Sequence, residues 1–277
     1  CTGHEGLHLG VNLETWHYYC WRCGWKPTSK ALAALTGTSE QKAKELIRQY
    51  RGPTAGRSLA REYNQRVNRK VVVHPYKHPT HCGHLTAQNR RYLERRGFDP
   101  EKLAREWGLL GTGPVSQLDG IDYRFRIVAP IYWEEEEVSF QTRDSTGKAD
   151  LKYLACPKRR ERIHHKHVLY GQPSAWDGIG ICVEGITDVW RLGPKSFALF
   201  GIQFKTEQIL HISNRFRRVV LLFDNDSQAR KQAKLLAARL RAGGTSVHLE
   251  ILPEGDPGDL TQDDADHLAK QLTKELC

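Results

Sequence analysis

The C-terminal part of the chain alternates between two hydrophobic patterns. Short runs of apolar residues are separated by segments with helical spacing, of which the longest is Gln228–Arg241. The apolar runs are Ile179–Val183, Ser196–Phe200, Val219–Phe223 and Val247–Leu252. Strands that alternate with helices are typical of a mostly parallel sheet with helices on both faces. Such sheets bind ligands at the edge where the carboxyl ends of their strands meet.

A different pattern precedes this region. A helix is expected around residues 89–94, with Gly97 closing it. Two strand-like runs, Tyr123–Trp133 and Val138–Arg143, flank the acidic turn Glu134–Glu137. We expect these two strands to pair antiparallel.

The N-terminal residues follow a third pattern. Residues 1–26 alternate polar and aromatic positions, and Ser29–Tyr50 shows helical spacing. Residues 51–85 are rich in Arg and broken by Pro, which indicates a connector. The fold class predicted from all three patterns is an α+β multidomain chain.

The positive charge is concentrated in the N-terminal third. Residues 1–97 contain 17 Lys and Arg against 6 Asp and Glu, whereas residues 98–277 contain 25 against 26. A local cationic excess favours a polyanionic partner, because Lys and Arg release condensed counterions when they pair with phosphates. A merely solvated charged surface is the alternative.

The chain contains neither a membrane-spanning stretch nor a signal peptide. Its longest apolar runs, such as Val219–Phe223, are far shorter than the roughly 20 residues that cross a bilayer. We therefore expect a soluble, intracellular protein without a membrane partner. Reduced thiols in that compartment favour metal binding over disulfides for the seven Cys.

Four residues near the N-terminus have the spacing of a zinc site. Cys1 and His4 form one close pair and Cys20 and Cys23 another, with fifteen residues between the pairs. Two such pairs suit a tetrahedral structural zinc whose positions are all filled by protein. Aromatic and cationic residues crowd residues 16–26, as in proteins that stack single-stranded bases. The alternative is that these rings form the small core of the unit.

Acidic residues follow three of the predicted strands. In chain order they are Glu184, Asp188, Asp224, Asp226, Asp256 and Asp259. Carboxylates gathered at one sheet edge repel one another unless cations lie among them, and hard oxygen ligands select Mg²⁺ or Mn²⁺. Two such ions support nucleotidyl transfer. The alternative for each single residue is a helix N-cap.

Two groups of histidines and one basic run are weaker signals. A second metal site is conceivable at His74, His78, His81, Cys82 and His84, or at His164, His165 and His167. Irregular spacing favours solvated histidines in both segments. The run Lys158–Arg162 lines the path of a template strand or is a solvated surface.

Together these motifs resemble the DnaG-type DNA primases over nearly the whole chain. The resemblance rests on the two ligand pairs, the acidic motifs and three basic motifs. The basic motifs are Arg124–Ile131, Ser139–Arg143 and Lys152–Leu154. One departure is that Asp259 lies three residues after Asp256, which leaves open which of the two matches the acidic pair of the family.

The resemblance implies a domain order. A zinc ribbon with its following helices would occupy residues 1–53, and a basic linker residues 54–85. The RNA polymerase core would consist of a mixed α+β basic subdomain at 86–177 and an α/β TOPRIM subdomain at 178–277.

It also implies an activity and roles for individual residues. The activity is RNA primer synthesis on single-stranded DNA from NTPs, with the zinc ribbon reading the template. Glu184, Asp224 and Asp226 would be catalytic, Asp224 and Asp226 as ligands of two Mg²⁺ or Mn²⁺ ions and Glu184 as a metal ligand or acid–base group. Asp188, Asp256 and Asp259 would support them in binding these ions. Nucleotide or template phosphates would contact Arg124, Arg126, Arg143 and Lys152. A separate replicative helicase and a cytoplasmic location, in a bacterium or for a phage or mobile element, are implied as well.

Two other functions compete with this one. A TOPRIM nuclease or topoisomerase-like enzyme would use the same acidic residues to cut DNA. A non-catalytic, zinc-dependent module that binds single strands would need only the N-terminal residues. The second alternative does not explain three acidic motifs at one sheet edge, where they weaken DNA binding.

Overall fold

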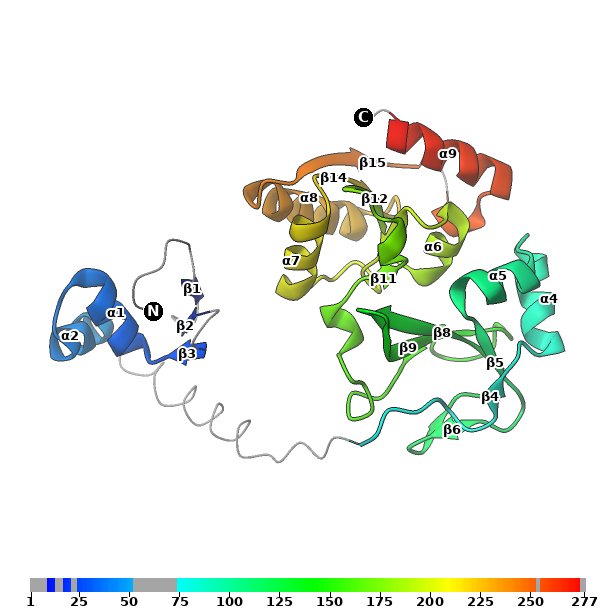
Figure 1. Cartoon of the computed structure of the whole chain (residues 1–277), viewed down its shortest axis with the longest axis horizontal. Helices are drawn as coiled ribbons and strands as arrows, with labels where there is room; N and C mark the ends of the chain where they lie inside the picture. Colours follow the sequence, from blue (N-terminus) through cyan, green and yellow to red (C-terminus); the bar gives the residue numbers. More distant parts are fainter. Residues whose placement is uncertain (1–8, 13–16, 21–23, 52–73, 253–254, 275–277) are drawn as a thin grey trace. The chain divides into compact units, whose positions relative to one another are not determined.

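The computed structural model describes residues 9–12, 17–20, 24–51, 74–252 and 255–274. The chain divides into two compact units, Cys1–Val71 and Val72–Cys277. The mixed α+β class expected from the sequence is confirmed (Figure 1). In the described residues, no helix combines the length and apolar character needed to cross a membrane.

The first unit contains a small antiparallel sheet followed by two helices. Its strands, in sheet order, are β1 (Leu9–Asn12), β2 (His17–Cys20) and β3 (Gly24–Lys26). The helices α1 (Thr28–Thr36) and α2 (Glu40–Arg51) follow. Gly37 ends α1 in the left-handed conformation (φ 66°), which a residue without Cβ adopts at little cost. The hydroxyl of Ser29 donates to Glu40 across the turn (3.0 Å) and ties the two helices together.

The second unit begins with an antiparallel sheet of order β10-β9-β8-β5-β4. These strands are β4 (Cys82–Gly83), β5 (Leu110–Thr112), β8 (Arg126–Trp133), β9 (Glu136–Asp144) and β10 (Tyr153–Ala155). The two long strands, β8 and β9, pair antiparallel, as predicted. The turn between them is shorter than the predicted acidic segment, because Glu134 and Glu135 alone make it, both with positive φ. A two-residue turn of this kind matches the twist of the flanking strands.

Two helices and a small hairpin accompany this sheet. They are α4 (Ala87–Arg95), α5 (Pro100–Trp107) and the pair β6 (Gln117–Leu118) and β7 (Ile121–Asp122). Thr86 caps α4 in a reciprocal pair of hydrogen bonds with Asn89. Asp99 caps α5 by accepting two backbone N–H groups. These caps satisfy backbone donors that a helix start leaves unpaired.

The second sheet of this unit is mostly parallel, as the alternating pattern predicted. Its order is β11-β13-β12-β14-β15, with only the edge strand β11 antiparallel. The strands are β11 (Tyr170–Gly171), β12 (Ile179–Val183), β13 (Ser196–Ala198), β14 (Arg218–Leu222) and β15 (Ser246–Glu250). The helices are α6 (Ile186–Leu192), α7 (Thr206–Arg215), α8 (Ser227–Ala242) and α9 (Gln262–Lys274).

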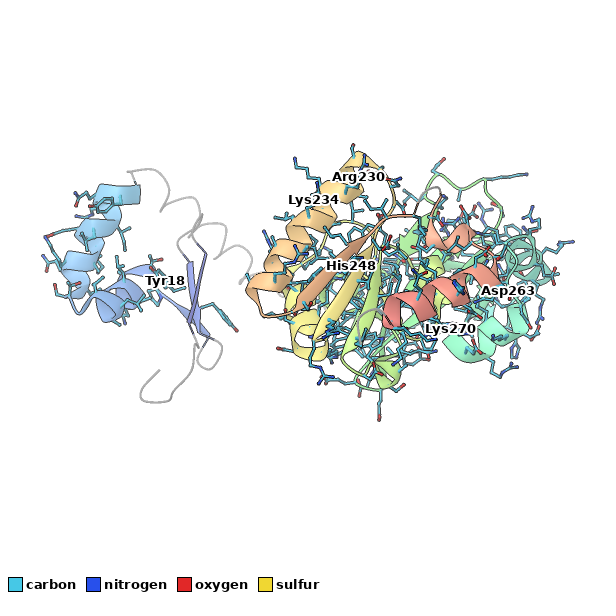
Figure 2. The ribbon with its side chains drawn as sticks, turned by 90° about the horizontal axis from the view of Figure 1, so that it is seen from above. Tyr18, Arg230, Lys234, His248, Asp263 and Lys270 are labelled. Atoms are coloured by element: carbon cyan, nitrogen blue, oxygen red, sulfur yellow. The ribbon has the colours of Figure 1, made fainter. Side chains whose placement is uncertain are left out.

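Helices cover both faces of the parallel sheet. α7 packs with α8, and α6 packs with α9. Figure 2 shows β15, which carries His248, between α8 with Arg230 and Lys234 and α9 with Asp263 and Lys270. Because both faces are covered, the inner strands are nearly continuous apolar runs, and β14 is buried at every residue except Arg218.

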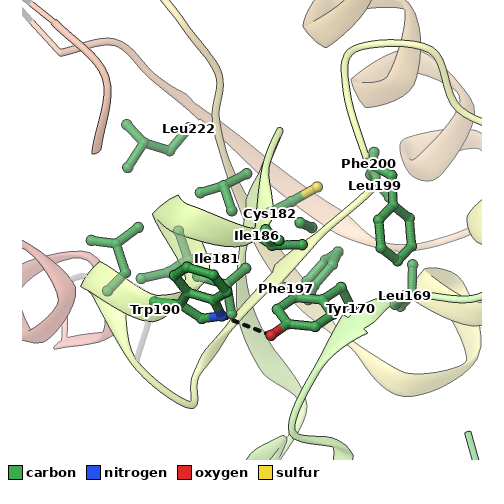
Figure 3. Close-up of a cluster of buried hydrophobic side chains, with 14 of the residues drawn as sticks. Leu169, Tyr170, Ile181, Cys182, Ile186, Trp190, Phe197, Leu199, Phe200 and Leu222 are labelled. Carbon is green, nitrogen blue, oxygen red and sulfur yellow. Dashed lines mark hydrogen bonds between the residues drawn. The ribbon is translucent and has the colours of Figure 1, made fainter. Parts of the chain in front are cut away.

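One hydrophobic core joins the two sheets of the second unit. It includes Ile127 and Ile131 of β8 as well as Ile181 and Phe197 of the parallel sheet. Figure 3 shows the part of this core around Trp190 of α6, whose indole N–H donates to the hydroxyl of Tyr170 (2.7 Å). The antiparallel sheet and the parallel sheet are therefore packed as one body.

Candidate active site

A cleft of about 470 Å³ opens at the carboxyl edge of the parallel sheet. Its lining draws on helix α4, strands β9 and β10 and the ends of three parallel strands. Seven of the residues singled out in the sequence line it: Arg143, Lys152, Glu184, Asp188, Asp224, Asp256 and Asp259. Residues separated by more than 100 positions thus meet in one cavity.

Glu184 follows the central strand β12 directly. Its Oε1 accepts the backbone N–H of Asp224 (3.0 Å), which links the ends of β12 and β14. Burial raises the pKa of Glu184 to about 7, and the negative charges of Asp224 and Asp226 add to the effect. A carboxyl group that titrates near neutral pH is suited to acid–base chemistry.

Asp188 lies in the first turn of α6 and is only 6% exposed. Its Oδ2 accepts the backbone N–H of Gly185 (2.9 Å), so the carboxylate is fixed at the helix start. Burial raises the pKa of Asp188 to about 7, and the charge of Asp256 is the next largest cause.

Asp224 follows β14 and lines the cleft together with Glu184 and Asp188. Burial raises the pKa of Asp224, and the charges of Asp256 and Asp226 raise it further. The ammonium group of Lys152 acts in the opposite direction. Carboxylates that raise one another's pKa lack sufficient cationic neighbours, and hard divalent cations bind to such oxygen clusters.

Asp256 precedes the short helical turn η3 (Pro257–Asp259) and Asp259 ends it, both beside Arg96. Asp259 forms an ion pair with Arg96 (2.5 Å), whereas Asp256 Oδ1 is 4.0 Å from the same guanidinium nitrogen. Asp256 Oδ1 is buried and has no hydrogen-bond partner among the described residues. This atom is therefore available to a cation.

Gly258 allows these carboxylates to approach one another. A Cβ at this position would lie 2.9 Å from Oδ1 of Asp188 and 3.1 Å from Oδ1 of Asp256. The requirement for glycine here is one of space, because no positive φ is recorded at this residue.

Asp226 lies outside the lining of the cleft. It is exposed and caps α8 by accepting the backbone N–H groups of Gln228 (2.7 Å) and Ala229 (2.9 Å). Its charge still raises the pKa of Glu184 and of Asp224. In the structure Asp226 is thus a helix cap close to the cluster.

Arg143 of β9 is held between two tyrosines on the other side of the cleft lining. Its Nε donates to the hydroxyl of Tyr92 (2.7 Å), and its guanidinium carbon is 4.7 Å from the ring centre of Tyr153. The Tyr153 hydroxyl hydrogen-bonds to that of Thr187 (2.9 Å), which ties β10 to α6. Arg143 pairs with no carboxylate in the described residues, so its charge is free for a ligand.

The remaining predicted cations are placed differently. Lys152 is exposed and lines the cleft. Arg124 is exposed and forms an ion pair with Asp122 (2.7 Å), and Arg126 is buried, with its Nη2 donating to the carbonyl of Leu151 (2.9 Å). The structure does not bring Arg124 or Arg126 into the cleft lining.

The proposed zinc ligands lie outside the described residues. Cys1, His4 and Cys23 belong to segments that are not described, and of Cys20 only its place in β2 is described. The prediction of a zinc site there stays a prediction.

The two histidine segments and the basic run have different surroundings in the structure. In the first histidine segment, Nε2 of His78 lies 2.5 Å from Oε1 of Glu137. Among the described residues, side chains with the geometry of a metal site occur at Glu161, His164 and His165. In the basic run Lys158–Arg162, Arg159 and Arg160 both form ion pairs with Asp119, which offsets one of their two charges.

Sequence reasoning missed Arg96, Tyr92 and Gly258. Arg96 lies at the end of α4, and its backbone carbonyl accepts from the buried guanidinium of Arg191 (2.5 Å). That contact spans 95 positions. In the sequence, a single Arg before a helix-ending Gly does not indicate such a long-range contact, because many surface helices end in the same way.

The fold is similar to solved structures of bacterial primases. No protein-family model and no curated protein matches the sequence. The zinc-binding and RNA polymerase domains of the Aquifex aeolicus primase superpose with a TM-score of 0.59 and 20% identity over 99% of this chain and 77% of that one. A DnaG primase catalytic domain bound to single-stranded DNA has a TM-score of 0.59 and 20% identity over 68% of this chain and 71% of that one. A DNA primase domain from Pseudomonas aeruginosa has a TM-score of 0.54 and 23% identity over 67% of this chain and 70% of that one. The resemblance to DnaG-type primases is therefore confirmed at the level of the fold.

Proposed function

We propose that this chain is a DNA primase, a nucleotidyltransferase that makes short RNA primers on single-stranded DNA. The observation that carries the proposal is the convergence of carboxylates from three strand ends with Arg143 and Lys152 in one cleft. Phosphoryl transfer depends on positioning and charge stabilisation, which bound metal ions and fixed cations provide. The shared fold supports this reaction over others, because one of the similar structures is a primase domain bound to single-stranded DNA.

Two Mg²⁺ or Mn²⁺ ions are the proposed cofactors of the cleft. Glu184, Asp188, Asp224 and Asp256 would hold them, and the unpartnered, buried Oδ1 of Asp256 fits this role. When bound, such ions activate the attacking 3′-hydroxyl and neutralise the leaving pyrophosphate. Asp259 would support the cluster through its ion pair with Arg96.

The cations of the cleft would position the substrates. Arg143 presents a planar guanidinium that is oriented by Tyr92 and suits bidentate contact with a phosphate of the incoming NTP. Lys152 supplies a second charge to nucleotide or template phosphates. Arg126 would act indirectly by fixing the carbonyl of Leu151, next to Lys152, whereas the exposed Arg124 remains a candidate for template contact.

The rest of the chain would deliver the template. In this proposal residues 1–53 form a zinc ribbon with Cys1, His4, Cys20 and Cys23 as ligands, and 54–85 are a basic linker. Residues 86–177 and 178–277 are the basic and TOPRIM subdomains of the RNA polymerase core. A separate replicative helicase as partner and a cytoplasmic location belong to the same proposal.

The test is primer synthesis from labelled NTPs on mixed-sequence single strands with Mg²⁺. We expect products from the parent chain and a loss of about a thousandfold or more in Asp224→Asn, since several kcal/mol of metal-dependent stabilisation disappear. Asp177→Asn is the matched control, because Asp177 is an exposed carboxylate paired with Lys195 away from the cleft lining.

Two outcomes would reject the proposal in different ways. A parent chain that cuts DNA without making primers would indicate the nuclease alternative. A parent chain that binds single strands by fluorescence anisotropy, yet neither cuts nor extends them, would indicate the non-catalytic module.

A further inference from the structure

A buried carboxylate lies where the chain crosses from the antiparallel sheet to the parallel sheet. The side chain of Glu161 is 1% exposed, and its Oε1 accepts from the hydroxyl of Ser139 in β9 (2.7 Å) and from the backbone N–H of His165 (3.0 Å). Its Oε2 has no hydrogen-bond partner in the part of the chain that the structure describes. A buried acceptor without a donor costs roughly 1–3 kcal/mol, so a missing partner is indicated.

Two histidines lie next to this carboxylate, one at each oxygen. Nδ1 of His164 is 3.3 Å from Oε2 of Glu161, and Nδ1 of His165 is 2.6 Å from Oε1. One donor atom from each of the three residues lies within 4.8 Å of the others. Ligands that bind zinc at about 2.0–2.1 Å in a tetrahedron are separated by about 3.3 Å, which is the spacing of His164 Nδ1 and Glu161 Oε2. The 2.6 Å between His165 Nδ1 and Glu161 Oε1 is a hydrogen-bond distance, so Oε2 is the carboxylate oxygen that faces the proposed ion.

The local backbone keeps the histidines in place. The short helical turn η1 (His165–His167) begins after His164, whose Nδ1 accepts the backbone N–H of Lys166 (3.3 Å). A zinc ion bound to this nitrogen would replace that hydrogen bond, because the nitrogen has a single lone pair. His165 is fixed from its other side by an edge contact with the ring of Phe200 (5.3 Å between ring centres).

We propose that Glu161, His164 and His165 form a second zinc site, distinct from both the cleft and the N-terminal Cys-containing site. Two imidazoles and one carboxylate are a ligand set that zinc uses with a water molecule in the fourth position. The ion supplies the partner that Oε2 of Glu161 lacks. A purely hydrogen-bonded cluster is the alternative, in which His164 would carry a proton on Nδ1 and donate it to Oε2 across 3.3 Å.

The site has a structural connection to the cleft. Lys166 is the middle residue of η1. Its ammonium group donates to the carbonyls of Leu199 (3.1 Å), Phe200 (2.6 Å) and Gln203 (3.1 Å). Phe200 has a positive φ of 62°, which is uncommon for a bulky residue, and it lines the cleft with Gly201. Zinc at Glu161 therefore stiffens the turn that holds this strained loop.

The experiment measures zinc per chain by elemental analysis after reconstitution of the full chain with Zn²⁺ and removal of the excess. The Cys20→Ser/Cys23→Ser background removes two of the three thiolate ligands of the proposed N-terminal site and leaves only Cys1 and His4 there. In this background we expect close to one zinc per chain, and close to none after His164→Gln/His165→Gln is added. His167→Gln is the matched control, because His167 neighbours the cluster without belonging to it.

Cobalt distinguishes the sites spectroscopically and does not depend on activity. Co²⁺ added to the Cys20→Ser/Cys23→Ser chain should give visible d–d bands without thiolate charge-transfer absorption, and Glu161→Gln should abolish them. Circular dichroism checks that each variant is folded. Zinc content near zero in a folded Cys20→Ser/Cys23→Ser chain, or content that is unchanged by the His164→Gln/His165→Gln exchange, would overturn the proposal.

Discussion

Two groups of carboxylates in this protein have opposite electrostatic surroundings. Asp119 accepts hydrogen bonds from Arg159 (2.8 Å) and Arg160 (2.7 Å), and these guanidinium groups hold the pKa of Asp119 well below its ordinary range. Glu184 and Asp188 instead have their pKa raised to about 7 by burial and by neighbouring carboxylates. Asp119 carries its own counter-charge, whereas Glu184 and Asp188 lack one, which bound divalent cations would supply in the proposed function.

The largest effect should follow from removing one charge of the cleft, and the matching change at Asp119 should have little effect. Glu184→Gln keeps the acceptor for the Asp224 N–H but removes a cluster charge, so we expect primer synthesis to fall by about a thousandfold or more. Asp119→Asn removes a carboxylate that its own arginines already neutralise. Its rate of synthesis should stay within about threefold of the parent.

Initial rates of primer synthesis at saturating NTP and template measure the effects of both exchanges. If the Asp119→Asn exchange impaired synthesis as strongly as Glu184→Gln, the contrast between self-paired and cation-binding carboxylates would not hold.

A smaller effect is expected from filling the space between the carboxylates. The Cβ of Gly258→Ala would enter van der Waals distance of Asp188 and Asp256 and displace at least one of them. We expect synthesis to fall about 10- to 100-fold, with an increase in the Mg²⁺ concentration required. Gly255→Ala is not a suitable control because Gly255 has a positive φ, whereas Gly113→Ala meets nothing within 4 Å. A Mg²⁺ titration that is unchanged in Gly258→Ala would contradict the packing argument.

The raised pKa values predict how stability varies with pH in Mg²⁺-free buffer. Glu184 has a pKa of about 7 when folded against an ordinary value of 4.5, so the folded chain binds its proton more tightly than the unfolded chain. The resulting stability is fully present below about pH 4.5 and is lost as the pH rises through about 7. Asp188 acts in the same direction.

The measurement is the difference in unfolding free energy between the parent and Glu184→Gln/Asp188→Asn. We expect the parent to lose on the order of 2 kcal/mol relative to this variant between pH 5 and 8, and Mg²⁺ at pH 8 to restore most of it. Taking the difference cancels the acid-labile groups, such as Asp119, that both chains share. A difference that is flat with pH would mean that the carboxylates are already neutralised within the protein.

The acidic side of the cleft could be read from the sequence, and the basic side only in part. Glu184 and Asp224 follow central apolar runs, and the chain order of strands and helices places such residues at one sheet edge. Arg143 and Lys152 were found through a family resemblance, since nothing in periodicity alone points to them. Arg96 was not found, because its contact with Asp259 joins positions 163 residues apart.

The roles of Asp226 and Arg126 show a second limit of sequence reasoning. Both belong to the quoted motifs, yet in the structure one caps α8 and the other is buried against the carbonyl of Leu151. A motif identifies residues that lie near a site without telling which side chains face it. That distinction depends on the exit direction of the chain after each strand, which tertiary packing determines.

The smallest effect separates the two possible roles of Asp226. Asparagine is as good an N-cap as aspartate, so Asp226→Asn keeps the hydrogen bonds to Gln228 and Ala229 and removes only the charge. If Asp226 acts through its charge from outside the cleft lining, synthesis should fall by less than about tenfold, since the charge is exposed and screened by water. Asp226→Ala should additionally lower the unfolding free energy by about 1 kcal/mol through loss of the cap. Rates and thermal unfolding of the two variants, measured at the same Mg²⁺ concentration, separate charge from capping. A thousandfold loss in Asp226→Asn with unchanged stability would instead mean that Asp226 turns into the cleft and binds a metal ion together with Asp224.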